Sequence, residues 1–138
     1  MNNSHRYSRA LKKLKSAGLR PTRQRLSLAR LLFEVNNRHV TAEQLHNEAI
    51  ETGIKVSLAT VYNTLHQFTQ AKLLREVVVE SGRAHFDTNV LEHHHIFNRD
   101  TGILCDIPKD TLSVINMPET PEGTEIERME LIVRVKSR

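Results

Sequence analysis

The fold of this chain is decided by the stretch Ser57-Leu58-Ala59-Thr60-Val61-Tyr62-Asn63-Thr64-Leu65, which has the pattern of a capped amphipathic helix. Ser57 is a favourable N-cap residue. Leu58, Val61 and Leu65 recur at helical spacing and define a buried side. The outer side is left with Ser57, Thr60, Tyr62 and Asn63. This helix is therefore predicted to present polar groups to a partner.

A second capped helix is predicted just before this stretch, over residues 42–52. Thr41 is a good N-cap residue, and Gln44 follows three residues later as in a capping box. Gly53 suits the C-cap position. The short connection that follows makes the two helices a helix-turn-helix. Two further helices are predicted upstream, at residues 1–18 and from Thr22 to Asn36 and Asn37.

A β-hairpin is predicted directly after the helix-turn-helix. Residues 73–79 are rich in β-branched side chains, Ser81-Gly82 is a turn signal, and Arg83–Asp87 would form the returning strand. Helices followed by such a hairpin are typical of a winged helix-turn-helix domain. We therefore predict this domain over residues 1–88.

The remaining residues, 89–138, have a different character. Strands are predicted at residues 93–98, 103–107 and 126–135, with a short helix at Pro108–Asn116. So few residues cannot bury much core alone, so pairing with a second copy is expected. The fold class is α+β, with a winged helix-turn-helix domain followed by a small α/β dimerisation domain.

The charge distribution points to a polyanion as partner. Residues 1–40 hold ten Lys and Arg against one acid, a net +9, whereas residues 41–138 hold ten against fifteen, a net −5. A solvated basic helix would give the same charge. With a recognition helix nearby, double-stranded DNA is favoured. Arg20, Arg23 and Arg25 suit phosphate or minor-groove contacts.

The polar side of the helix that starts at Ser57 suits base readout. Asn63 can pair with adenine, and Thr60 or Tyr62 can contact a thymine methyl group. Ser57 at the helix start can bond a phosphate. A half-buried packing role for Tyr62 is the alternative.

Three segments of the chain resemble the ferric uptake regulator (Fur) family. They are Gly-Leu-Arg-Pro-Thr-Arg-Gln-Arg at 18–25, Arg-His-Val-Thr-Ala-Glu-Gln-Leu at 38–45, and the stretch at 57–65. Glu-His-His-His-Ile at 92–96 resembles that family's histidine motif, usually His-His-Asp-His. The resemblance runs from about residue 10 to about residue 106. Within the family, the triplet and the missing cysteines look most like the iron response regulator branch of rhizobia and relatives, whose members answer to haem and iron supply.

The resemblance implies DNA contacts by Tyr62 and its helix, with an arginine near residue 20 in the minor groove. It also implies a sensory site between the domains, using His39, Asp87, His93 and His95. Asp87 stands where the family usually has Glu, and the loop that follows looks one residue shorter.

The cysteine content departs from the family pattern. Asn98 and Thr101 stand where the family's first Cys-x-x-Cys pair is usual, and Cys105 is the only thiol. A structural four-cysteine zinc site is therefore impossible within one chain. No Cys-Pro haem motif is present, so any haem response must rest on histidine.

The three consecutive histidines are predicted to alternate faces on a strand, with His93 and His95 on one side and His94 on the other. Two imidazoles so spaced suit one Mn²⁺, Fe²⁺ or Zn²⁺ ion, with Asp87 and His39 completing the shell. Haem is the other ligand considered, with one histidine of the triplet as an axial ligand. A solvated polar strand remains the simplest alternative.

The sequence thus predicts a DNA-binding transcriptional regulator of iron or haem homeostasis, modulated by haem or metal at the histidines. The alternative is an Mn²⁺- or Fe²⁺-dependent Fur-type repressor, and a histidine metalloenzyme is remote because no His-Glu-x-x-His motif is present. The expected partners are an A/T-rich palindromic operator and a second copy, as a homodimer or higher assembly. No membrane segment or secretory signal is evident, so the protein is expected in the cytoplasm.

Overall fold

A computed structural model describes residues 3–80, 83–113 and 116–138, with side chains described from Arg9 onward. The chain divides into two compact units, Met1–Val90 and Leu91–Arg138. Each unit is described by itself below. No helix within the described ranges is long and apolar enough to cross a membrane.

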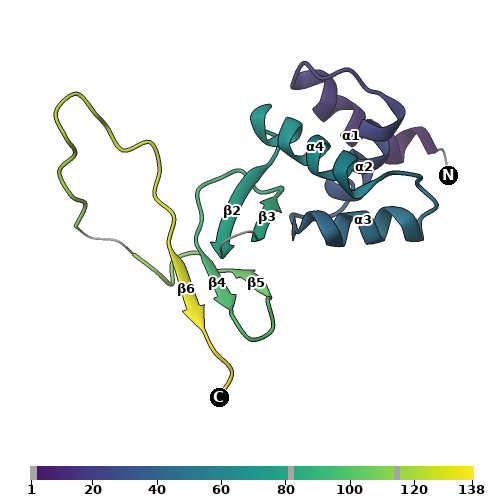
Figure 1. The fold of residues 1–138 in the computed structure, drawn as a ribbon. Helices are drawn as coiled ribbons and strands as arrows, with labels where there is room; N and C mark the ends of the chain where they lie inside the picture. The colour runs from purple at the N-terminus through teal and green to yellow at the C-terminus, as the bar shows by residue number, and fades with distance from the viewer. Residues whose placement is uncertain (1–2, 81–82, 114–115) are drawn as a thin grey trace. The chain divides into compact units, whose positions relative to one another are not determined.

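The N-terminal unit begins with its helices (Figure 1). They are α1 (Asn3–Ser16), α2 (Arg23–Phe33), α3 (Ala42–Glu51) and α4 (Leu58–Gln70). The hydroxyls of Thr22, Thr41 and Ser57 each accept a backbone N–H three residues ahead, and Thr41 forms the complete capping box with Gln44. Helix α2 ends earlier than predicted, at Phe33, because its C-cap is Glu34.

A small sheet completes this unit. It contains β1 (His39–Val40), β2 (Arg75–Glu80) and β3 (Arg83–Asp87) in the antiparallel order β1-β3-β2. Strand β1 was not predicted, since two residues are too short to show a strand pattern. Strand β2 starts later than predicted, because Lys72 ends α4 with a φ of 64° and a turn follows. The predicted turn at Ser81-Gly82 lies outside the described residues. The winged helix-turn-helix is confirmed.

One continuous core joins the helices to the sheet. Its fully buried members come from every helix and from β1 and β3, and include Leu14, Leu32, Leu45, Leu65, Phe68 and Phe86. Burial of large apolar side chains is the main force that stabilises a domain. The core therefore fixes α4, with its polar side outward, on the rest of this unit.

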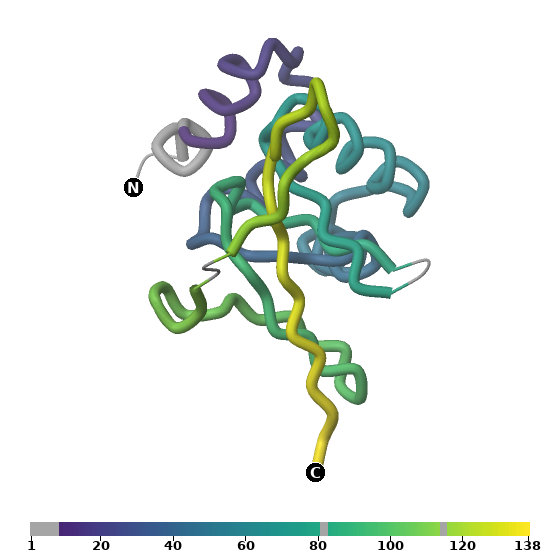
Figure 2. The backbone as a smooth tube through the Cα atoms, turned by 90° about the vertical axis from the view of Figure 1, so that its left-hand side faces the viewer, coloured from purple at the N-terminus to yellow at the C-terminus, as the bar shows by residue number. Residues whose placement is uncertain are grey.

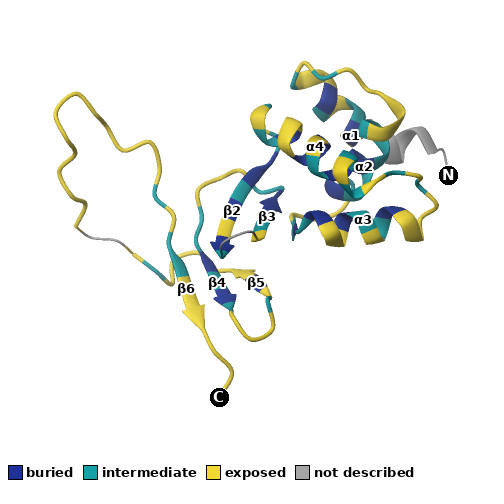
Figure 3. Cartoon of the chain, in the orientation of Figure 1, coloured by how far each residue is buried: buried dark blue, intermediate teal, exposed yellow. Residues whose placement is uncertain are grey.

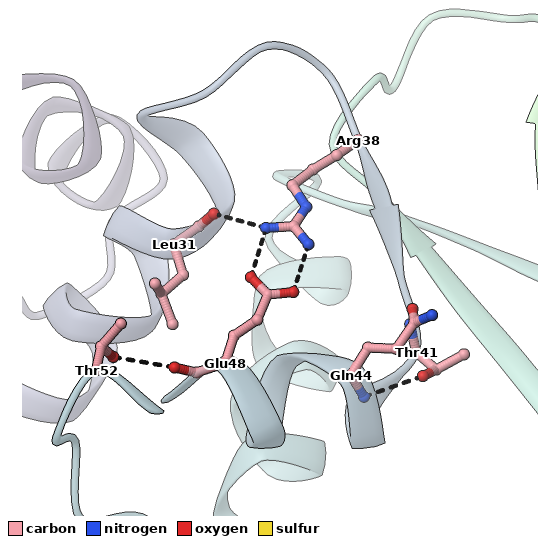
Figure 4. Close-up of polar contacts among 6 residues, drawn as sticks. All are labelled: Leu31, Arg38, Thr41, Gln44, Glu48 and Thr52. Atoms are coloured by element: carbon pink, nitrogen blue, oxygen red, sulfur yellow. Dashed lines mark hydrogen bonds and ion pairs between the residues drawn. The ribbon is translucent and has the colours of Figure 1, made fainter. Parts of the chain in front are cut away.

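Helix α3 is held in place by Arg38 (Figure 4). The Arg38 guanidinium binds Glu48 through two hydrogen bonds of 2.8 and 2.6 Å and also donates to the Leu31 carbonyl near the end of α2. The Arg38 backbone exchanges hydrogen bonds with Thr88, just after β3. One side chain thus ties α2, α3 and the start of β1 together.

The C-terminal unit is a sheet with the order β5-β4-β6. Its strands are β4 (His95–Asn98), β5 (Leu104–Asp106) and β6 (Ile132–Val135), and β6 runs parallel to β4. Among the described residues of this unit, only His95, Phe97 and Leu104 are buried, and Figure 3 shows most of it as exposed.

Several predictions for this unit were wrong in detail. No helix forms over residues 108–113; instead Thr111 closes a turn on the Pro108 carbonyl, and Asp110 has a φ of 70°. The rest of the predicted helix includes residues 114–115, which are outside the described residues. Between β5 and β6 the described chain takes a long irregular path (Figure 2).

The strands themselves are shorter than predicted. Strand β4 starts at His95 rather than residue 93, and β6 starts at Ile132 rather than residue 126. The reason is visible in the contacts of the flanking residues. The His94 side chain accepts the Leu131 N–H, and Glu92 accepts the Met129 N–H, where a ladder would need backbone carbonyls.

Candidate functional site

The polar side of α4 holds the predicted base-reading residues at the surface. The Ser57 hydroxyl accepts the Thr60 N–H at 3.1 Å and donates to the Thr60 hydroxyl at 2.9 Å, so these two side chains are joined to each other. Asn63 is exposed. Tyr62 is half-buried, with its ring against the core and its hydroxyl outside it. These side chains come from one helix end, as a groove-reading helix requires.

The predicted arginines lie at the start of α2, and one of them reaches α4. Arg25 donates from Nε and Nη2 to the Gln67 Oε1, at 3.2 and 3.1 Å, and from Nη1 to the Arg20 carbonyl. A neutral amide orients this guanidinium without cancelling its charge. Arg20 and Arg23 are exposed. A groove lies between the start of α2 and α4. It is lined by Thr22, Gln24, Arg25, Thr60, Asn63, Thr64 and Gln67.

Tyr62 also has a partner that the sequence analysis missed. Its hydroxyl donates to the Glu43 Oε1 on α3 at 2.6 Å. The hydrogen bond lowers the pKa of Glu43 from its ordinary 4.5 and raises the pKa of Tyr62 from 10.0. The two residues lie nineteen positions apart on different helices, so the sequence spacing did not predict the contact.

The first pair of predicted metal ligands lies in the N-terminal unit. His39 on β1 is directly opposite Asp87 on β3 in the sheet register. Asp87 is only 1% exposed, and its Oδ1 accepts the Asn89 N–H. The strand pairing therefore brings these two residues together, although they are far apart in the sequence.

The C-terminal unit brings its own donors together. The Nε2 atoms of His93 and His95 lie 3.4 and 3.3 Å from the Asp106 Oδ1, and the two rings are 4.5 Å apart. One ligand atom from each of the three residues lies within 4.8 Å of the others. His95 is 1% exposed. Two imidazoles and a carboxylate that converge in this way are a donor set for a transition-metal ion.

The tautomer of His93 is set by its other ring nitrogen. Its Nδ1 donates to the Leu91 carbonyl at 2.6 Å, which leaves the Nε2 lone pair directed at Asp106 and available to a metal. His94 points elsewhere, because its Nδ1 accepts the Leu131 N–H at 3.0 Å. The structure thus joins His93 with His95 and separates His94 from them.

Asp106 was missed at the sequence level, although a signal was present. A hairpin centred on the predicted turn Asp100-Thr101-Gly102 would place Ile107 opposite His95, whereas the observed register centres between Asp100 and Thr101 and places Asp106 there. Counting back across the predicted turn therefore brings Asp106 to within one residue of the position opposite His95, which is the signal that was available.

Comparison with known proteins gives a consistent result. Residues 16–134 match the sequence model of the Ferric uptake regulator family. The ferric uptake regulation protein of Shigella flexneri is 37% identical over 100 residues, covering 72% of this chain and 68% of that protein. The ferric uptake regulator of Pseudomonas aeruginosa, solved with manganese, has a TM-score of 0.69 at 25% identity, over 94% of this chain and 98% of that one. The Vibrio cholerae ferric uptake regulator has a TM-score of 0.73 at 24% identity, over 99% and 100%.

Proposed function

This chain belongs to the ferric uptake regulator family, and we propose that it is a repressor-type regulator whose operator affinity is set by a divalent metal ion at His93, His95 and Asp106. Regulators of this family control metal homeostasis, bind DNA and act as dimers. They are transcription regulators rather than enzymes, which rules out the metalloenzyme alternative.

The observation that carries the proposal is the convergence of two imidazole nitrogens on one carboxylate oxygen. Imidazole and carboxylate together suit Mn²⁺, Fe²⁺ or Zn²⁺, and a related regulator was solved with manganese. The Leu91 carbonyl supports the site by holding His93 in the ligating tautomer. His39 and Asp87 stay predictions as further ligands.

The haem-responsive alternative, in the manner of the iron response regulator branch, is a second candidate from the sequence. Axial ligands of haem lie on opposite faces of a flat ring. His93 and His95 direct their Nε2 atoms at one point, which favours a small ion over a macrocycle. Haem would have to use one histidine of the triplet, with its second ligand elsewhere.

The proposed operator follows from the pairing of two copies. A two-fold dimer places two recognition helices on two half-sites, so a palindromic operator is expected. Arg20, Arg23 and Arg25 suit a narrow, A/T-rich minor groove. Ser57, Thr60, Tyr62 and Asn63 would read the major groove, in a homodimer or a higher assembly.

The test is a fluorescence anisotropy titration of an operator duplex, obtained by selection from a random duplex library. The metal-free protein is titrated alone, with Mn²⁺ and with haem, at one fixed salt concentration. We expect tight binding only with Mn²⁺. Tight binding by the metal-free protein that haem abolishes would overturn the metal proposal in favour of haem.

Matched variants connect the response to the site. We expect Asp106→Asn and His95→Ala to weaken Mn²⁺ binding at least tenfold, measured by calorimetry, because the first replaces a charged carboxylate by a neutral amide and the second removes an imidazole donor. Asp110→Asn is the control, since it removes an exposed carboxylate from the same unit outside the site. Equal losses in Asp106→Asn and Asp110→Asn would contradict the assignment.

A further inference from the structure

We infer that Glu43 is a positioning residue for DNA reading: from α3, its carboxylate holds the Tyr62 hydroxyl and so fixes the direction of the Tyr62 ring on the outer side of α4. This inference rests on the proposed function, because it takes Tyr62 to contact DNA. It adds a residue from the first helix of the helix-turn-helix to the determinants of specificity.

The Tyr62 side chain is held at three places. Its ring packs against the core of the N-terminal unit. One face stacks with His66 on the next turn of α4, at 6.4 Å between centroids and 20° between planes, and His66 in turn meets Phe86 edge-on. The hydroxyl donates to Glu43 at 2.6 Å. This hydrogen bond is the contact that anchors the polar end of the ring.

Glu43 is itself on a fixed support. It lies in the first turn of α3, between the two residues of the capping box, Thr41 and Gln44. Near the other end of that helix, the Glu48 carboxylate accepts from Arg38, and Arg38 also donates to the Leu31 carbonyl on α2 (Figure 4). The positive end of the helix dipole favours a carboxylate at this place. Glu43 therefore offers Tyr62 a stationary, charged acceptor.

The negative charge of Glu43 indicates that its contact with Tyr62 improves the discrimination between DNA sequences rather than the affinity for DNA. A carboxylate next to the reading helix repels the phosphate backbone, so Glu43 lowers affinity for any duplex. A group that weakens general binding contributes to recognition only through geometry. Holding a reading side chain in its bound direction limits the entropy lost on binding and sharpens the preference for the correct base.

The test measures discrimination, the ratio of affinities for the selected operator and for a scrambled duplex at the same salt and metal concentration. We expect Glu43→Ala to bind scrambled DNA more tightly and to lose discrimination about tenfold, the scale of one base contact. Glu43→Gln keeps an acceptor oxygen without the charge, and should keep most of the discrimination. Glu51→Ala removes an equal charge from the far end of α3 and should leave discrimination unchanged.

A double-mutant cycle measures whether Glu43 acts through Tyr62, a coupling that a general structural role of Glu43 would not produce. Tyr62→Phe removes only the donor, so Glu43→Ala combined with Tyr62→Phe should discriminate no worse than either alone. Additive losses would overturn the inference, as would full discrimination by Glu43→Ala while the wild-type protein discriminates normally. A wild-type protein without discrimination would overturn the proposed function as well.

Discussion

The two units of this chain differ in how much of their own surface they bury. In Met1–Val90 a continuous core draws on every helix and on the wing sheet, whereas the described part of Leu91–Arg138 buries only His95, Phe97 and Leu104 (Figure 3). Stability scales with buried apolar area. The first unit therefore has the means to fold by itself, and the second depends on a partner surface, in line with the dimers of this family.

The two candidate sites are divided between the two units in the same way. The predicted DNA contacts all lie in the well-packed unit, where a rigid core fixes the reading helix. The His93, His95 and Asp106 donors lie in and directly beside a sheet with few buried residues of its own. A ligand acts by binding one arrangement better than another, and a unit with few buried apolar contacts resists rearrangement less, which suits a sensor.

The largest expected effect is in the first unit. Phe68 on α4 is fully buried, and the centroid of its ring lies 6.1 Å from that of Phe33 on α2. We expect Phe68→Ala to lower the free energy of unfolding by about 3–5 kcal/mol, because it leaves a cavity. Urea unfolding followed by circular dichroism measures this loss.

The contrast with the second unit is the control. Phe97 is one of the three buried described residues of that unit, so we expect Phe97→Ala to loosen its sheet and thereby weaken assembly, raising the dimer dissociation constant about tenfold or more, roughly 1.4 kcal/mol, measured by sedimentation. The comparison between the units would be broken if Phe97→Ala left assembly unaltered and cost as much unfolding free energy as Phe68→Ala.

An intermediate effect is expected at Arg38. Arg38→Ala removes two hydrogen bonds to Glu48 and one to Leu31, each partner being partly exposed. The expected cost is about 1–3 kcal/mol of unfolding free energy. Arg23→Ala, which removes an exposed arginine at the start of α2, serves as the control. Thermal unfolding with equal midpoints for both variants would count against the role of this contact.

The smallest effect concerns pH. The Tyr62 hydrogen bond lowers the pKa of Glu43, so its stabilising contribution is present above 4.5, the ordinary pKa, and is lost as pH falls through the folded value. For Tyr62, whose pKa is raised, the contribution is present below 10.0 and is lost as pH rises through the folded value. In Tyr62→Phe we expect the pKa of Glu43 to rise, measured by NMR titration.

Thr60→Ala is the matching control for that titration, because Thr60 bonds Ser57 and not Glu43. A Glu43 pKa that stays lowered in Tyr62→Phe would show that another group sets it.

Local patterns account for what could be predicted from the sequence. The caps Thr22, Thr41 and Ser57 act within one helical turn, so their helices began where expected. The hairpin at β2 and β3 is likewise a contact between near neighbours. The helix predicted at Pro108–Asn116 does not form over its described residues, because the Thr111 N–H and hydroxyl both donate to the Pro108 carbonyl and close a turn there.

The sequence by itself determined the four N-terminal helices, the hairpin that completes the winged helix-turn-helix and most of the residues of both candidate sites, because helix periodicity, capping and turn chemistry act over a few residues. Only the tertiary structure decided that Glu43 meets Tyr62, that Asp106 joins His93 and His95, and that His94 turns to Leu131. Those contacts join segments distant in the chain, and their partners depend on strand register and helix packing.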